Sequence, residues 1–209
     1  MKTINFLGLI VLFASVISCS SDDDTIETLP VESELIQNLH APQEGGQGEP
    51  VYGEFTKFNF ATGQTTTSET DWDIALRGTI ILINGGEKTG IDDEPNRTGN
   101  GSAYIANGTM SSVTSVDTSR LKEDGENAQA IPTGSGTGWY IYAGAPTHLI
   151  TPIAGKILVF KTHDGKYAKM EILSYYKDAP ADPDAFEDFD KYYTFNYVYQ
   201  PNEGDANFN

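Results

Sequence analysis

Apolar residues in the C-terminal third of the chain alternate with polar ones or form short unbroken runs, and both patterns are typical of β-strands. Residues 156–162 are apolar on both sets of alternating positions, which predicts a central strand covered on both faces. The polar residues 163–165 follow and end in glycine, as a three-residue hairpin connection requires. The return strand, 166–176, alternates an apolar set with a polar set that contains Lys169 and Glu171, so we expect it to be half-buried.

The same patterns predict further strands along the rest of the chain. They lie at residues 51–60, 72–77, 80–83, 103–105, 139–142, 148–152 and 192–199. The first of these contains Gly53, where a bulge can shift the register. We expect the strand at 72–77 to be half-exposed and the strand at 80–83 to be buried.

Helical periodicity is weak throughout the chain. Within the polar stretch 111–138, only residues 118–126 indicate a helical turn. The predicted fold class is therefore mainly β, with few short helices. We expect an antiparallel β-sandwich-like domain in which two antiparallel sheets pack face to face.

The first residues have the pattern of a signal peptide. Lys2 precedes an apolar run, 6–17, that is too short to span a bilayer as a mature helix. The run ends in Val-Ile-Ser-Cys at 16–19, which is similar to the lipobox of bacterial lipoproteins, where the cysteine is lipidated and becomes the mature N-terminus. We therefore predict a signal peptide at 1–18 and lipidation of Cys19. Because Cys19 is the only cysteine, the monomer has no internal disulfide.

Composition divides the remaining chain into a tether and one domain. Residues 20–24, Ser-Ser-Asp-Asp-Asp, resemble the acidic signal that sends Bacteroidetes lipoproteins to the cell surface. Residues 19–48 are poor in aromatics and contain proline and a glycine cluster, which predicts a flexible tether with one short ordered piece around 35–39. Residues 49–209 have the length of a single β domain.

The charge of the chain excludes some partners. A formal net charge of −17 disfavours nucleic acid, whose binding depends on neutralising phosphates with Lys and Arg. The same charge disfavours a basic membrane-binding patch, so membrane attachment is expected through the lipid alone.

Several segments together resemble the HmuY family in their order and spacing. They are Thr-Asp-Trp-Asp-Ile-Ala-Leu at 70–76, Asn-Gly-Gly at 84–86, Gly-Trp-Tyr at 138–140, the hairpin at 164–176 and the aromatic strand at 193–200. The resemblance implies a mainly β lipoprotein of Bacteroidetes that binds haem at the cell surface. Such a haemophore serves iron acquisition by passing haem to an outer-membrane receptor, which is expected to be TonB-dependent.

The resemblance also implies where the haem iron would be held. Characterised members use two axial side chains, a pair of His or a pair of Met, from the region between the Trp-Asp strand and the final hairpin. His148 lies about where the second ligand falls, and Trp139, Tyr140 and Tyr142 could stack on a flat porphyrin. Upstream, only Met110 could serve as a first ligand, because residues 111–147 contain neither Met nor His.

Because the sequence offers few axial ligands, several modes of iron coordination stay open. A five-coordinate iron, a tyrosine ligand and complete loss of haem binding are each compatible with the sequence. The competing hypothesis keeps the fold and the lipid anchor but makes the domain a non-enzymatic binding or adhesion module for another ligand.

An acidic loop follows the hairpin and could hold calcium. Its carboxylates include Asp182, Asp184, Glu187 and Asp188, and calcium prefers several oxygen ligands within reach. The spacing does not match an EF-hand, so a solvated acidic loop is the alternative.

The sequence gives no support for an enzyme. Ser135 lies between two glycines but lacks the strand, sharp turn and helix of a nucleophile elbow. The chain contains no phosphate loop or dinucleotide fingerprint. We therefore expect a binding protein.

Overall fold

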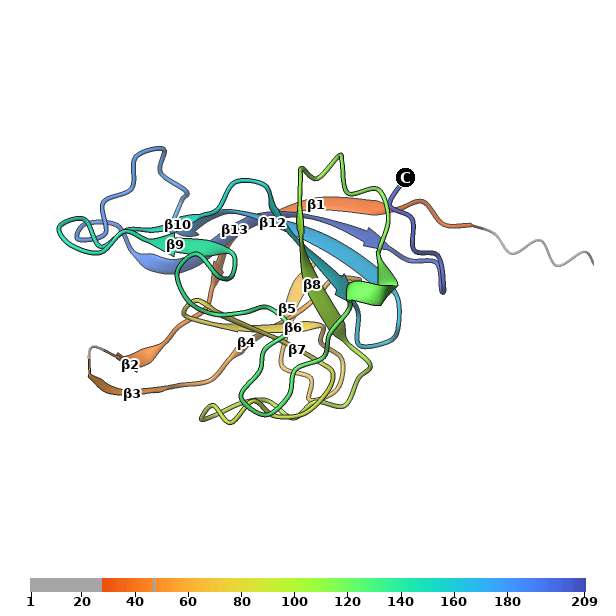
Figure 1. Ribbon diagram of the computed structural model, residues 1–209, viewed down its shortest axis with the longest axis horizontal. Helices are drawn as coiled ribbons and strands as arrows, with labels where there is room; N and C mark the ends of the chain where they lie inside the picture. Colours follow the sequence, from red (N-terminus) through yellow and green to blue (C-terminus); the bar gives the residue numbers. More distant parts are fainter. Residues whose placement is uncertain (1–27, 47) are drawn as a thin grey trace, which may run out of the picture.

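Two antiparallel sheets form the body of the protein in the computed structural model, which describes residues 28–46 and 48–209 (Figure 1). The larger sheet has the strand order β1-β13-β12-β11-β8, and the smaller has the order β5-β4-β6-β7. Two two-stranded ribbons, β2–β3 and β9–β10, lie at one end of the molecule (Figure 1). The signal peptide and Cys19 lie outside the described residues.

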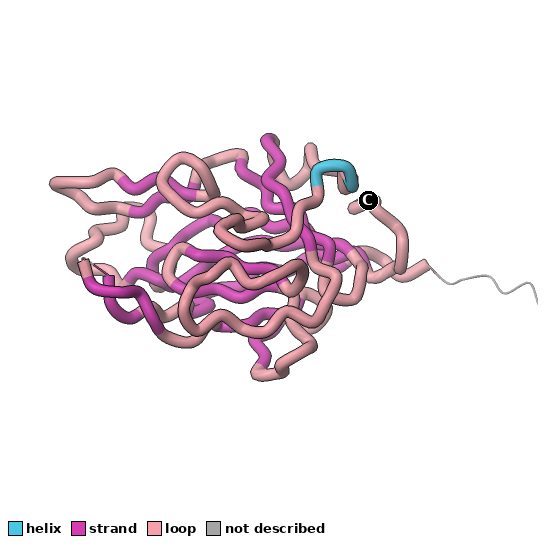
Figure 2. The backbone as a smooth tube through the Cα atoms, turned by 60° about the horizontal axis from the view of Figure 1, so that its bottom comes forward, coloured by secondary structure: helices cyan, strands magenta, loops and turns pink. Residues whose placement is uncertain are grey.

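The strands of the larger sheet are β1 (Glu32–His40), β8 (Ser102–Asn107), β11 (Lys156–Lys161), β12 (Tyr167–Tyr176) and β13 (Asp190–Gln200). Those of the smaller sheet are β4 (Thr56–Asn59), β5 (Gln64–Thr66), β6 (Ile74–Arg77) and β7 (Ile80–Ile83). The ribbons contain β2 (Glu44–Gly46), β3 (Glu49–Tyr52), β9 (Tyr140–Tyr142) and β10 (Ile150–Pro152). A 3-10 turn, η1 (Thr118–Arg120), lies near the C-terminus (Figure 2). In the part of the chain that the structure describes, no helix is long and apolar enough to cross a membrane.

The predicted central hairpin is confirmed. β11 pairs with β12 on one side and with β8 on the other, and Leu158 lies opposite Met170. Leu158 belongs to the main core, whereas Ile157 and Val159 belong to a second apolar cluster on the other face of the sheet. The unbroken apolar run of this strand therefore reflects burial on both faces.

Aromatic side chains fill the space between the two sheets. The inward face of β13 carries Tyr193, Phe195, Tyr197 and Tyr199, each at most 3% exposed. From the smaller sheet, the ring of Phe58 lies 5.5 Å from that of Phe195, edge to face. This packing of two antiparallel sheets around one core confirms the predicted sandwich-like fold.

Lys169 is an exception in the return strand β12, which is half-buried as predicted. Its side chain faces away from the main core, but the residue is only 4% exposed. The Nζ donates to the carbonyl oxygens of Met110 (2.6 Å) and Val113 (2.7 Å) and lies 4.9 Å from the ring of Phe208. The loop after β8 and the C-terminal residues cover Lys169. Further along the same face Glu171 is half-buried and Leu173 is 47% exposed, so the strand is otherwise half-buried as predicted.

The smaller sheet differs from its prediction at two places. The single irregular strand expected at 51–60 is two strands, β3 and β4, that belong to different sheets. Gly53 lies between them with φ of 109°, a conformation that suits glycine. β6 is fully buried rather than half-exposed, because Arg77 on its outer face donates to the carbonyl oxygens of Gly53 and Asp92 in the covering loops.

The N-terminal strand β1 corrects the extent of the tether. Residues 32–40 pair along β13 as the edge strand of the larger sheet, so the ordered piece expected around 35–39 is longer than predicted. Leu39 is 5% exposed and joins the main core. Pairing with β1 satisfies backbone groups on β13 that would otherwise form an open edge.

Candidate functional site

The β9–β10 ribbon and the loop 177–189 lie at one end of the molecule (Figure 1). Both segments carry exposed apolar side chains. Tyr142 in β9 is 44% exposed, and Ile141 beside it is 50% exposed. Phe186 and Phe189 in the loop are each 71% exposed. We call this surface the aromatic end. Large exposed apolar patches commonly mark ligand or partner sites.

His148 lies at the centre of the aromatic end, in the turn that joins β9 to β10. The residue is exposed, its backbone N–H donates to the carbonyl oxygen of Gly144 (2.7 Å), and its φ is 55°. Its Nδ1 is hydrogen-bonded to the hydroxyl of Tyr142. The ring of Phe186 stands edge to face with the imidazole, with 5.8 Å between ring centroids. Because this hydrogen bond uses Nδ1, Nε2 is the ring nitrogen available to a ligand.

The acidic loop is ordered by its own carboxylates. Asp184 Oδ1 accepts from the backbone N–H of Phe186 (2.9 Å), and Asp188 Oδ2 accepts from the backbone N–H of Asp184 (2.8 Å). Such bonds from Asp side chains to nearby amides stabilise turns. They hold Phe186 beside His148.

The calcium site predicted in this loop is not found. Among the residues with described positions, no group of three or more His, Cys, Asp or Glu side chains is arranged to hold a metal ion. Asp182 and Glu187 therefore do not join Asp184 and Asp188 in a cluster. The carboxylates of the latter two face backbone amides instead of a common centre.

Two of the three residues expected to stack on a porphyrin, Trp139 and Tyr140, are buried in the core. Trp139 is 1% exposed, packs against Tyr193 in the core at 5.2 Å, and donates from Nε1 to the carbonyl oxygen of Thr79 (3.0 Å). Tyr140 is 9% exposed, and its hydroxyl accepts from Thr79 Oγ1 (3.3 Å). Both rings are occupied by core contacts, so only Tyr142 of the three predicted residues is available at the surface.

Met110 lies in a different part of the molecule from His148. It is half-buried on the outer face of the larger sheet, in a shallow groove lined also by residues of β1 and β13. Its loop follows β8, whereas His148 follows β9 (Figure 1). The structure therefore does not bring these two predicted ligands together.

The other two histidines have partners elsewhere. His40 stacks on the ring of Tyr192 at 4.3 Å, and His163 Nδ1 lies 2.7 Å from Asp73 Oδ1. His163 thus contacts the smaller sheet, whereas His40 borders the aromatic end, because the ring of Tyr192 lies 5.9 Å from the Nζ of Lys177. His148 is the imidazole that contacts two strongly exposed aromatic rings, those of Tyr142 and Phe186.

Three residues of this site were not predicted from the sequence: Phe186, Phe189 and Lys177. Lys177 is exposed, and its Nζ lies 5.9 Å from the ring of Phe189. The sequence did contain a signal for the two phenylalanines. They are large apolar residues in an otherwise polar, acidic loop, and exposed apolar residues can mark a binding site. Sequence alone did not show that the loop folds next to His148.

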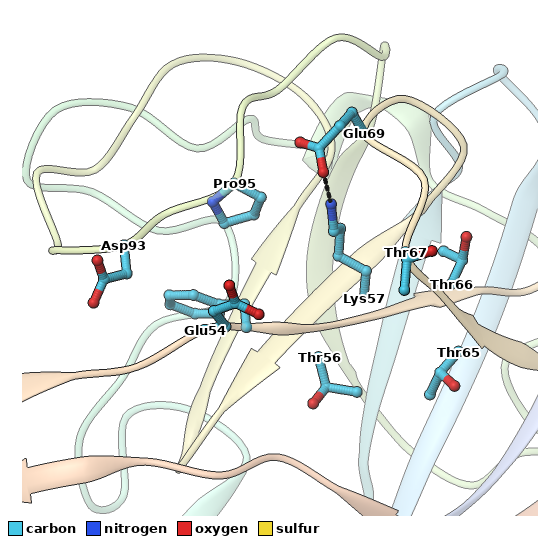
Figure 3. A pocket seen from close by; sticks show the side chains of 10 residues that line it. Glu54, Thr56, Lys57, Thr65, Thr66, Thr67, Glu69, Asp93 and Pro95 are labelled. Atoms are coloured by element: carbon cyan, nitrogen blue, oxygen red, sulfur yellow. Dashed lines mark hydrogen bonds and ion pairs between the residues drawn. The ribbon is translucent and has the colours of Figure 1, made fainter.

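A cleft on the smaller sheet is lined mainly by polar and charged side chains, unlike the aromatic end (Figure 3). Its volume is about 650 Å³, and Lys57 pairs with Glu69 across it at 2.9 Å. Its remaining lining residues are Glu54, Phe55, Thr56, Thr65, Thr66, Thr67, Asp93 and Pro95. This lining has no imidazole, thioether or phenol, which are the usual protein ligands of haem iron besides thiolate. The aromatic end is therefore the better candidate for haem.

Comparison with known proteins gives a family match. A family model described as HmuY protein matches residues 51–197. No curated protein matches the chain.

Three solved structures are similar to the chain at low sequence identity. The apo HmuY analog of Tannerella forsythia is 19% identical, with 86% of this chain and 100% of that chain covered and a TM-score of 0.49. A protein described as a lipoprotein of Bacteroides fragilis is 14% identical, with coverage of 84% and 94% and a TM-score of 0.44. A protein described as a HmuY-like heme binding protein of Bacteroides vulgatus is 16% identical, with coverage of 82% and 93% and a TM-score of 0.40.

Proposed function

Because the chain belongs to the HmuY family, we propose that it binds haem, and that it does so at the aromatic end. The observation that carries this proposal is an exposed imidazole, that of His148, set among exposed apolar rings. Imidazole is a common axial ligand of haem iron, and neutral histidine binds metals through either ring nitrogen.

The side chains around His148 suit a flat, largely apolar ligand. Phe186, which contacts the imidazole, and Phe189 in the same loop offer apolar surface that is open to solvent and would be buried by a bound macrocycle. Haem also carries two propionate groups. Lys177 supplies a cation beside Phe189, in a chain whose net charge is −17.

His148 is the axial ligand in this proposal, and it would hold the iron through Nε2. Bound haem would supply a redox-active iron centre, and the protein would supply one imidazole, the surrounding rings and the cation of Lys177. Residues 139–152 and 177–189 contain no second histidine and no methionine. We therefore propose a single protein ligand from this end rather than the pair used by characterised members.

The cellular setting is proposed from the N-terminal sequence. A lipid on Cys19 would anchor the domain to the outer membrane, and the acidic residues 20–24 favour export to the cell surface. A haem-binding domain held there could deliver its ligand to a TonB-dependent receptor. Binding is the proposed activity, and no catalytic step is part of it.

Titration of the purified domain with haemin tests the proposed function. We expect a shifted Soret band in the wild-type protein and loss of that shift in His148→Asn, because asparagine tolerates the positive φ but has no imidazole. His163→Asn is the matched control, since His163 lies in the β11–β12 turn and contacts Asp73 of the smaller sheet. A free-haemin spectrum with the wild-type domain would overturn the proposal and favour a different ligand for the same fold.

A further inference from the structure

Tyr142 and His148 form a hydrogen-bonded pair inside the β9–β10 ribbon. Tyr142 ends β9 and lies opposite Ile150 in the register of the ribbon, which brings its ring next to the turn that carries His148. The hydroxyl of Tyr142 contacts Nδ1 of the imidazole, and their ring centroids are 5.9 Å apart. The proposed function uses the histidine but leaves the tyrosine hydroxyl without a role.

We propose that Tyr142 is a positioning residue that fixes the tautomer and orientation of His148. This inference rests on the proposed function, because it assigns a second role within the same site. A histidine binds iron through an unprotonated nitrogen, so ligation through Nε2 requires the ring proton on Nδ1. The hydroxyl oxygen of Tyr142 then accepts that proton in a hydrogen bond. Histidines that bind metals usually donate their second ring N–H to such a partner.

Contacts on the other sides of the imidazole agree with this orientation. The edge of the ring that carries Nδ1 faces Tyr142, and Phe186 packs edge to face against the ring. The backbone of His148 is held by its hydrogen bond to Gly144. With these sides occupied, the ring presents Nε2 as the nitrogen open to the ligand.

The same pair allows a second chemistry, which serves as the alternative outcome. If the phenol gave its proton to Nδ1, the oxygen of Tyr142 would be the iron ligand and His148 its hydrogen-bond partner. A hydroxyl is both donor and acceptor, so the contact alone is compatible with either arrangement. We favour the imidazole as ligand because His148 lies in the turn, in contact with the exposed ring of Phe186, whereas Tyr142 belongs to strand β9.

The first test measures the haem-free protein and does not depend on haem binding. Nitrogen-15 NMR of the imidazole distinguishes the two neutral tautomers of His148. We expect the Nδ1–H form to predominate in the wild-type protein and its population to fall in Tyr142→Phe, which removes only the hydroxyl. A wild-type His148 that is mainly Nε2–H would overturn the inference. Tyr167→Phe is the control. Tyr176, at one end of β12, contacts Ile150 of the β9–β10 ribbon, and Tyr167 lies at the opposite end of the same strand.

The second test measures haemin affinity and the Soret spectrum of the same variants. We expect haemin binding to weaken about tenfold in Tyr142→Phe with the imidazole-ligated spectrum retained, and that spectrum to vanish in His148→Asn. Loss of axial ligation in Tyr142→Phe but not in His148→Asn would make the phenol the ligand and overturn the inference. If Tyr142→Phe had the wild-type tautomer population and the wild-type haemin affinity, the inference would be overturned but the proposed function would stand. A free-haemin spectrum for wild type would instead overturn the proposed function, and this role in haem binding with it.

Discussion

The Nδ1 of His163 lies 2.7 Å from Oδ1 of Asp73, and this contact ties the two sheets together. His163 belongs to the β11–β12 turn of the larger sheet, and Asp73 precedes β6 of the smaller sheet. The same carboxylate also accepts from the backbone N–H of His163 (3.0 Å) and of Phe60 (2.7 Å). Asp73 therefore links three separate segments, and His163, in the polar hairpin connection predicted at 163–165, is a structural contact.

This contact predicts a pH dependence of stability. The pKa of His163 is raised, chiefly by its hydrogen bond with Asp73 and against the effect of burial. Because the folded-state pKa is above the unfolded one, the contribution is complete below about pH 6.5 and is lost as the pH rises through the raised pKa. We expect the free energy of unfolding in urea to fall as the pH rises from about 6.5 through the raised pKa of His163.

The variant His163→Asn serves as the control for that measurement. Its amide can still donate to Asp73 but does not titrate in this range. We expect a flatter dependence of unfolding free energy on pH for His163→Asn than for the wild-type protein. Equal slopes for the two proteins would contradict the assignment to His163.

Asp124 is a buried carboxylate whose removal should strongly destabilise the fold. It accepts from the backbone N–H groups of Ile83 (3.0 Å) and Ala130 (2.8 Å) and pairs with Arg97 (3.0 Å). Asp124→Ala leaves these donors, including a buried cation, without that partner, so we expect a loss of about 3–5 kcal/mol. Urea denaturation measures the effect. Glu126→Ala, at an exposed position nearby, should change stability by less than about 0.5 kcal/mol, and similar losses in both would refute the prediction.

Phe186 should contribute to haemin binding without contributing to stability. Its side chain is 71% exposed, and its ring contacts His148. We expect Phe186→Ala to weaken haemin binding about threefold to tenfold, since aromatic contacts of this kind are worth roughly 0.5–1.5 kcal/mol, and to leave the melting temperature unchanged. Leu35→Ala, which removes another exposed apolar side chain on β1, is the control. Wild-type affinity in Phe186→Ala would place the ligand elsewhere.

Lys177 should make haemin binding sensitive to salt. It is the cation beside Phe189, and propionates of a bound haem would be attracted to it. We expect Lys177→Gln to weaken binding severalfold at low ionic strength and to reduce the difference in affinity between low and high salt. Lys122→Gln, another exposed lysine, should behave like the wild-type protein. Equal salt dependence in Lys177→Gln and the wild-type protein would exclude this role.

Calcium should leave the thermal stability of the domain unchanged. The carboxylates of Asp184 and Asp188 already accept from backbone amides of their own loop. We therefore expect the same melting temperature with and without millimolar calcium, measured by calorimetry. A rise in melting temperature that disappears in Asp184→Ala would restore the calcium site to this loop.

Strand periodicity was sufficient to predict much of the fold. The alternation of aromatic residues from Tyr193 to Tyr199 and the apolar run at 156–162 predicted an inward-facing strand and a doubly covered strand, and both are confirmed. These patterns are local, because the side chains of a strand alternate between its faces whatever lies across from them. The resemblance to the HmuY family, carried by the same segments, is confirmed by the family match.

The tertiary structure alone decided which of these residues are enclosed and which are free. Lys169 reads as an exposed strand lysine until the chain after β8 folds over it, and Trp139 reads as a candidate ring for haem until the core fills around it. Phe186 reaches His148 from 38 positions away along the chain. Periodicity reports how one strand divides its own side chains between two faces. Which distant segment covers each face depends on how the whole chain packs, and that packing places His148, Tyr142 and Phe186 in one site.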